Sequence, residues 1–246
     1  MPIQLNADVV LLDIEGTTSS IDFVHKVMFP FARERVEAFV NANWESDSLS
    51  ACVDLLAKDL KYESVDSWLS GETVKDQQTV IDAVVDMIDN DVKATGLKQL
   101  QGIIWKEGFH SGDLVAHLYE DTAPALKRWK EAGLDLRIYS SGSIGAQKLF
   151  FGHSVAGDLL HLFSGHYDTT TGPKQETESY RKIVSDIGVA ADRIVFVSDV
   201  PGELDAATEA GMQTVLSVRP GNAAVDDLAK YQAVDSFAEL TLSKTG

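Results

Sequence analysis

The chain has 246 residues, of which 44% are hydrophobic and 24% charged, so it can form a core domain that carries a smaller insertion. Lysine and arginine number 21 against 38 acidic residues, and the net charge of −17 argues against binding to nucleic acid or to anionic membranes. The single cysteine, Cys52, excludes an internal disulfide and a thiolate metal cluster. The chain shows neither a signal peptide nor an apolar stretch of the roughly 20 residues that span a bilayer, so we expect a cytoplasmic protein.

Short apolar runs bounded by polar residues predict the buried strands of a parallel sheet. These runs are Val9–Leu12, Leu134–Tyr139, Arg193–Val197 and Thr214–Val218. Helical patterns separate the later runs, at Ala146–Gly152, Glu176–Ile187 and Glu203–Ala210. This alternation of strands and helices predicts an α/β fold with a doubly wound parallel sheet.

The segment between the first two predicted strands is helical in character. Amphipathic patterns cover Phe23–Trp44, Leu49–Leu60, Val74–Val92 and Leu97–Phe109, and a further helix, Asp121–Gly133, returns the chain to the sheet. We therefore predict a core domain of residues 1–18 and 120–246, with a helical cap domain of residues 19–119 inserted after the first strand. We expect the last residues, Leu242–Gly246, to be frayed.

Two carboxylates, Asp13 and Glu15, follow the first predicted strand. Ligands of open α/β sheets bind outside the carboxyl ends of the strands, so chemistry is expected here. Asp13 is a candidate nucleophile that forms an aspartyl phosphate, and Glu15 is a candidate general acid and base. Taken alone, the pattern fits equally well an acidic turn in which Thr17 or Thr18 caps the next helix.

Polar residues also follow the later strands. Ser140 and Ser141 offer hydroxyl and backbone N–H groups that can hold a phosphate, although a serine here can also be a helix N-cap. Lys174, in a Gly-Pro-Lys loop, can stabilise both the Asp13 carboxylate and a transferring phosphoryl group, although most such lysines are solvated.

Asp199 ends the next predicted strand and can complete a Mg²⁺ site with Asp13, since Mg²⁺ favours one or two carboxylates together with water and phosphate oxygens. The metal would also offset the negative charge that opposes an anionic substrate. Alternatively, Asp199 is an N-cap and Glu203 lies in the first helical turn. The order of the four elements at the ends of strands favours a catalytic site over the separate structural explanations.

This order resembles the haloacid-dehalogenase-like superfamily, in which an Asp-x-Asp-x-Thr element is followed by a Ser or Thr strand end, a lysine and a distal acidic element. The chain departs from it at Glu15, where most phosphatases of the superfamily have a second aspartate. With that departure, the chain resembles the acireductone synthases, the enolase-phosphatases of methionine salvage, from about Val9 to Leu240. The segments that carry this resemblance are Asp13–Ile21, Phe23–Val24, Leu100–Gly102 with Trp105, Tyr139–Ser143, Ala146–Leu149, Phe151–Gly152, Glu178–Tyr180 and Arg219–Asn222.

The resemblance implies a cytoplasmic monomer that enolises 2,3-diketo-5-methylthiopentyl-1-phosphate and then removes its phosphate. The product is an acireductone, 1,2-dihydroxy-3-keto-5-methylthiopentene. The implied Mg²⁺ ligands are Asp13, Asp199 and the backbone carbonyl of Glu15. The implied phosphate-binding residues are Ser140, Ser141 and Lys174.

The sequence leaves the enolisation base open among Glu15, His25, Glu107 and His110, and a solvated or packing role is favoured for the last three. The cap domain is expected to exclude water and to supply an apolar pocket for the methylthio group. Candidate pocket residues, which can equally be plain core, are Phe23, Phe29, Trp105 and Phe109. The alternatives are a phosphatase for another small phosphoester without an enolase step, a metal-free dehalogenase, and a catalytically idle binding protein on the same fold.

Overall fold

The computed structural model describes residues 2–244. The chain divides into two compact units, one formed by Met1–Val24 together with Val115–Gly246 and the other by His25–Leu114. The second unit corresponds to the inserted domain, for which the sequence predicts residues 19–119. Each unit has its own core, and the two are described separately below.

The first unit is built on a six-stranded parallel sheet in the order β4-β3-β2-β5-β6-β7. The strands are β2 (Val9–Leu12), β3 (Asp135–Tyr139), β4 (Phe163–Tyr167), β5 (Ile194–Ser198), β6 (Gln213–Ser217) and β7 (Ala233–Val234). The chain runs outward from β2 through β3 to β4 and then returns to β5 on the other side of β2. This reversal makes the carboxyl ends of β2 and β5 a topological switch point, where open α/β sheets bind their ligands. The predicted doubly wound parallel sheet is confirmed.

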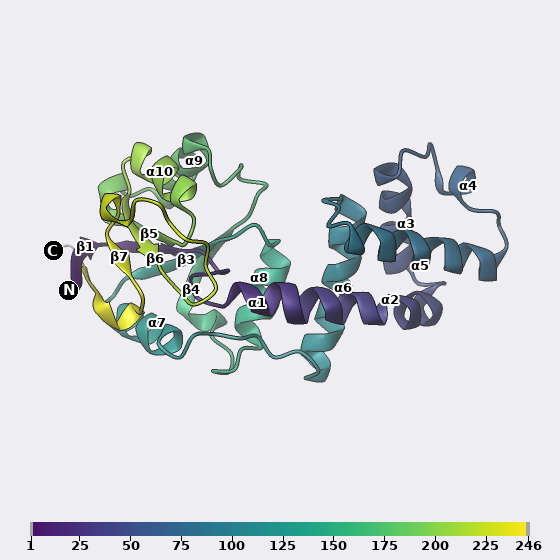
Figure 1. The fold of residues 1–246 in the computed structure, drawn as a ribbon, viewed down its shortest axis with the longest axis horizontal. Helices are drawn as coiled ribbons and strands as arrows, with labels where there is room; N and C mark the ends of the chain where they lie inside the picture. The colour runs from purple at the N-terminus through teal and green to yellow at the C-terminus, as the bar shows by residue number, and fades with distance from the viewer. Residues whose placement is uncertain (1, 245–246) are drawn as a thin grey trace. The chain divides into compact units, whose positions relative to one another are not determined.

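Helices cover both faces of this sheet, which explains why all four residues of β2 are buried. In Figure 1, α9 (Thr177–Ile187) and α10 (Pro201–Glu209) cover one face and α7 (Thr122–Glu131) covers the other. The core beneath α9 and α10 includes Phe196, whose ring centroid lies 5.2 Å from that of Tyr180. Between β3 and β4 the chain forms α8 (Ile144–Gly152).

The two ends of the chain pair with each other, because β1 (Ile3–Ala7) and β8 (Leu240–Lys244) form a separate parallel ribbon. The expectation of a frayed end is therefore wrong for Leu242–Lys244, while residues 245 and 246 lie outside the described part. Leu240 and Leu242 are buried, whereas the residues between and after them are exposed. This alternation keeps one face of β8 in the core, which a search for continuous apolar runs does not detect.

The second unit is helical, and none of its described residues forms a strand. Its helices are α2 (Phe29–Asn43), α3 (Asp47–Asp59), α4 (Val65–Trp68), α5 (Thr73–Asp89) and α6 (Thr95–Ser111). The single helix predicted over Phe23–Trp44 is interrupted. It consists of α1 (Ile21–Phe23), a π-helical turn at Val24–Met28 and α2, whose Pro30 has no backbone N–H to donate. Among residues 2–244, no helix combines the length and the apolar character needed to cross a membrane.

Candidate active site

The loop after β2 holds Asp13 at the switch point. The Asp13 backbone N–H donates to the carbonyl of Val197 in the neighbouring β5, and the Asp13 side chain is only 7% exposed. The chain then turns tightly around the carbonyl of Ile14, which accepts backbone N–H bonds from Thr18 and from the residues on either side of it. The Thr18 hydroxyl also donates to the backbone carbonyls of Asp13 and Ile14. The N-cap of α1 is Ser20, so neither threonine of this loop has the predicted alternative role of helix cap.

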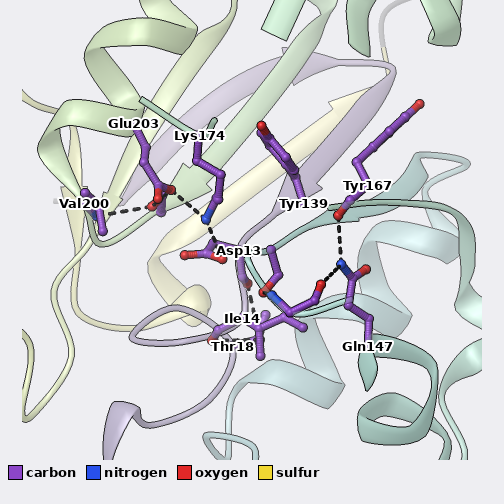
Figure 2. Close-up of polar contacts among 12 residues, drawn as sticks. Asp13, Ile14, Thr18, Tyr139, Gln147, Tyr167, Lys174, Val200 and Glu203 are labelled. Carbon is purple, nitrogen blue, oxygen red and sulfur yellow. Dashed lines mark hydrogen bonds and ion pairs between the residues drawn. The ribbon is translucent and has the colours of Figure 1, made fainter. Parts of the chain in front are cut away.

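Lys174 joins Asp13 to a second carboxylate (Figure 2). Its Nζ lies 2.8 Å from Asp13 Oδ1 and 2.7 Å from Glu203 Oε2. The Ser198 hydroxyl donates to the same Glu203 oxygen at 2.8 Å. Burial opposes the charged form of Lys174, but the negative charges of Asp13 and Glu203 outweigh it and raise the pKa of the ammonium group. Lys174 is therefore a buried cation, and the alternative of a solvated loop lysine does not hold.

Tyrosine hydroxyls fix the backbone that carries this lysine. Tyr180, on α9, donates its hydroxyl to the Lys174 carbonyl at 2.6 Å, and Tyr139, at the end of β3, donates to the carbonyl of Gly172 at 2.9 Å. Both rings are fully buried and pack edge to face, with centroids 5.5 Å apart. These hydrogen bonds fix the backbone of the Lys174 loop, and the ion pairs fix its ammonium group.

Asp199 follows β5 and lies against the turn at Gly16. Gly16 has a φ of +66°, and a β-carbon at this position would lie 2.3 Å from Asp199 Oδ2. Burial, and then the nearby charge of Asp13, raise the pKa of Asp199 to about 7. The N-cap of α10 is Val200 and its first residue is Pro201, so Asp199 is not the helix cap.

The serines after β3 lie at the same edge of the sheet as Asp13, but within residues 2–244 no hydrogen bond joins them to Asp13 or Lys174. Ser140 is buried, and its hydroxyl accepts the backbone N–H of Gly142, whereas Ser141 is exposed. The N-cap of α8 is Ser143, so the predicted serine N-cap is present in this segment, but it is neither Ser140 nor Ser141.

A Mg²⁺ ion fits the residues at this site. The carboxylates of Asp13, Asp199 and Glu203 face a single ammonium group, that of Lys174, so the ionised site has an excess of negative charge. No three His, Cys, Asp or Glu side chains in the described range 2–244 are grouped as a ready-made metal centre. Mg²⁺ takes few protein ligands and completes its shell with water and substrate phosphate oxygens, so two carboxylates at this edge of the sheet are enough to hold it.

The candidates for the enolisation base differ in their surroundings. Glu15 is half-buried in the first unit, where its backbone bridges to that of Ser19. His25, Glu107 and His110 are exposed residues of the second unit. The structure singles out none of the four as the base.

The aromatic candidates for the substrate pocket make packing contacts. Phe23 packs edge to face on Phe150 at 5.8 Å, Phe29 lies 5.9 Å from Trp105, and Phe109 is buried. A role for any of these residues in binding substrate stays a prediction.

Comparisons with known proteins place the chain in a family. A model of haloacid dehalogenase-like hydrolases matches residues 7–211. Proteins named enolase-phosphatase E1 are 45% identical in Synechococcus elongatus, with 98% of this chain and all of the relative covered, and 51% identical in Alcanivorax borkumensis, with 84% and 87% covered. The crystal structure of the UTR4 protein of Saccharomyces cerevisiae is 36% identical, covers 94% of this chain and 98% of its own, and superposes with a TM-score of 0.77.

The chain belongs to the enolase-phosphatase E1 family of haloacid dehalogenase-like hydrolases. The resemblance drawn from sequence is thereby confirmed. Glu203 is the main feature of this family member's site that the sequence motifs did not indicate, because an acid in a first helical turn has an adequate explanation in the helix dipole. The signal available in the sequence was its position: Glu203 comes four residues after Asp199, in the first turn of a helix that begins at the switch point.

Proposed function

We propose that this chain is an acireductone synthase, a Mg²⁺-dependent enolase-phosphatase of methionine salvage. It converts 2,3-diketo-5-methylthiopentyl-1-phosphate to 1,2-dihydroxy-3-keto-5-methylthiopentene and inorganic phosphate. Near full-length identity to proteins named enolase-phosphatase E1 supports the substrate and the reaction. The single observation that carries the chemistry is the pairing of buried Lys174 with Asp13 at the switch point of the sheet.

In the phosphatase step, an Asp13 carboxylate oxygen attacks phosphorus and the bond between phosphorus and the substrate C1 oxygen breaks. Glu15 gives a proton to the departing oxygen, and its carboxylate then takes a proton from the water that attacks the aspartyl phosphate. This second attack breaks the bond between phosphorus and the Asp13 oxygen and releases inorganic phosphate. Lys174, held 2.8 Å from Asp13 Oδ1, offsets negative charge on the transferring group.

Before that step, a base removes a proton from the carbon next to a carbonyl of the diketone, which gives the enolate, and return of a proton to the carbonyl oxygen gives the enol. Glu15 is the candidate in the first unit, and His25, Glu107 and His110 are the candidates in the second. The helical unit serves as a cap that excludes water during this step.

The metal would be held by the Asp13 and Asp199 carboxylates and by the Glu15 carbonyl, and it would supply positive charge to the phosphate and enediolate oxygens. Ser140 and Ser141 bind the phosphate through hydroxyl and backbone N–H groups. All of the named residues except the cap candidates come from one unit of one chain, so the site needs no second copy of the chain, and we propose that the enzyme acts as a monomer. We place the enzyme in the cytoplasm, where its single cysteine would stay reduced.

The test is to incubate the purified protein and Mg²⁺ with the diketone phosphate, and to follow enol absorbance in the ultraviolet and free phosphate together. We expect the enol signal to precede phosphate release and one phosphate to appear per substrate consumed. Release of phosphate from a simple ester such as 4-nitrophenyl phosphate, with no conversion of the diketone, would instead favour a phosphatase that has no enolase step.

A further inference from the structure

The last residue of β6 and the segment after it bind the backbone of the Asp13 loop. The carbonyl of Gly16 accepts a hydrogen bond from the Ser217 hydroxyl at 3.1 Å and another from Asn222 Nδ2 at 2.9 Å. The next carbonyl, that of Thr17, accepts from Arg219 Nε at 3.3 Å. Ser217 and Arg219 are buried, so these bonds are shielded from competing water.

These contacts also fix the orientation of the Asn222 amide. Nδ2 donates both to the Gly16 carbonyl and to that of Ser217, at 3.1 Å, so the flipped amide would bring its oxygen against two acceptors. Oδ1 must therefore point away from both carbonyls. It is buried and has no hydrogen-bond partner within the described residues 2–244.

The unpaired oxygen lies next to Asp199. A β-carbon on Gly16 would be 2.3 Å from Asp199 Oδ2 and 2.8 Å from Asn222 Oδ1, so both oxygens face the same small space in front of the turn. Neither can donate to the other when Asp199 is ionised. Buried polar atoms are almost always paired, so a donor such as a water molecule is expected between them.

We propose that Asn222 is a positioning residue for the magnesium site. Its Nδ2 holds the turn that presents the Glu15 carbonyl, and its Oδ1 accepts a hydrogen bond from a water molecule that belongs to the ion's shell beside Asp199. The inference rests on the proposed function for the presence of Mg²⁺. Residues that orient metal ligands in this way typically contribute about 10-fold to 100-fold to metal affinity.

The test measures Mg²⁺ binding by titration calorimetry in the absence of substrate. We expect Asn222→Ala to raise the dissociation constant for Mg²⁺ about 10-fold or more. Ser217→Ala removes one of the two bonds to the Gly16 carbonyl and should raise the dissociation constant by a smaller factor. It also serves as the test if Asn222→Ala does not fold.

The matched control is Gln213→Ala, at the other end of β6. Gln213 Nε2 likewise donates to two backbone carbonyls, those of Asn6 at 2.7 Å and Asp192 at 2.6 Å. Asn222→Ala and Gln213→Ala should both lower the melting temperature. Of these two variants, only Asn222→Ala should weaken Mg²⁺ binding. Wild-type affinity in Asn222→Ala, or equal weakening in Gln213→Ala, would overturn the inference. Absence of Mg²⁺ binding by the wild type would instead contradict the proposed metal site itself.

Discussion

Replacing Lys174 by alanine tests whether the buried ion pairs hold the site together. The variant leaves the carboxylates of Asp13 and Glu203 without the ammonium group that lies 2.8 Å and 2.7 Å from them. Removing one partner of a buried ion pair costs about 3–5 kcal/mol, because the remaining charge is neither solvated nor paired. We expect a loss of that size in the free energy of unfolding at pH 8 when metal is chelated.

The loss should depend on pH with a defined sign. Burial and the charge of Asp13 raise the pKa of Glu203 to about 7 in the folded protein. The folded state therefore binds this proton more tightly than the unfolded state, and the resulting contribution to the free energy of unfolding is complete below the unfolded pKa. The contribution is lost as the pH rises through about 7. In Lys174→Ala, the Glu203 pKa rises further, because Lys174 lowers it in the wild type. The variant should therefore go on losing stability above pH 7, and each additional pH unit should widen its deficit by up to about 1.4 kcal/mol.

Urea unfolding followed by tryptophan fluorescence, at pH 6, 7 and 8 in EDTA, measures this deficit. Lys230→Ala is the control, because Lys230 pairs with Asp205 on the surface, where both side chains are about half exposed, and its loss should change stability little. A deficit of Lys174→Ala that matches this control, or one that shrinks between pH 7 and pH 8, would refute the reasoning.

The other predictions concern the catalytic residues, the metal and the turn at Gly16. Asp13→Asn should reduce phosphate release below about 1% of the wild-type rate, since the amide cannot attack phosphorus, and a faster rate would contradict the nucleophile assignment. Excess EDTA should abolish turnover and added Mg²⁺ restore it, whereas full activity after chelation would favour a dehalogenase-like mechanism. Glu15→Asp should keep Mg²⁺ affinity but slow at least one step about 100-fold, because the carboxyl group is withdrawn by roughly 1 Å. Enol that accumulates without phosphate would place Glu15 in the phosphatase step, and unchanged kinetics would leave only its carbonyl with a role. Gly16→Ala should weaken Mg²⁺ binding through the clash at Asp199, whereas Gly188→Ala, with a φ of +76° and no atom within 4 Å of the added β-carbon, should lower thermal stability alone.

The sequence predicted the central sheet well because its strands carry continuous apolar runs. β2 and β5 are buried along their whole length, which no surface strand imitates. β4 was missed because it is an edge strand in which Tyr167 alone is buried, and its sequence FSGHY has no apolar run. β1 and β8 were missed because their pairing joins the two ends of the chain, and short polar-apolar alternation does not show such long-range partners.

The candidate site was predictable as far as strand ends reveal it. Asp13 and Asp199 each follow a buried run, and parallel order brings such ends to one edge of a sheet. The burial of Lys174 could not be deduced, because it depends on tyrosine hydroxyls from α9 and β3 that bind the backbone of its loop. The hydrogen bond from Asn222 to the Gly16 carbonyl likewise joins residues far apart in the chain, and the spacing of residues in the sequence does not predict it.

The position of β2 at the centre of the sheet has a consequence for synthesis on the ribosome. Its partner strands begin at Asp135 and Ile194, which follow the helical unit in the sequence. At about 5–20 residues per second, roughly 6–25 s pass between the translation of Leu12 and that of Tyr139, the last residue of the first partner strand. During that time His25–Leu114 can leave the exit tunnel and fold on local contacts, while the apolar residues Val9–Leu12 have no strand to pair with. The nascent chain therefore exposes an entirely apolar strand while the helical unit is made, and a ribosome-associated chaperone would be expected to bind this segment.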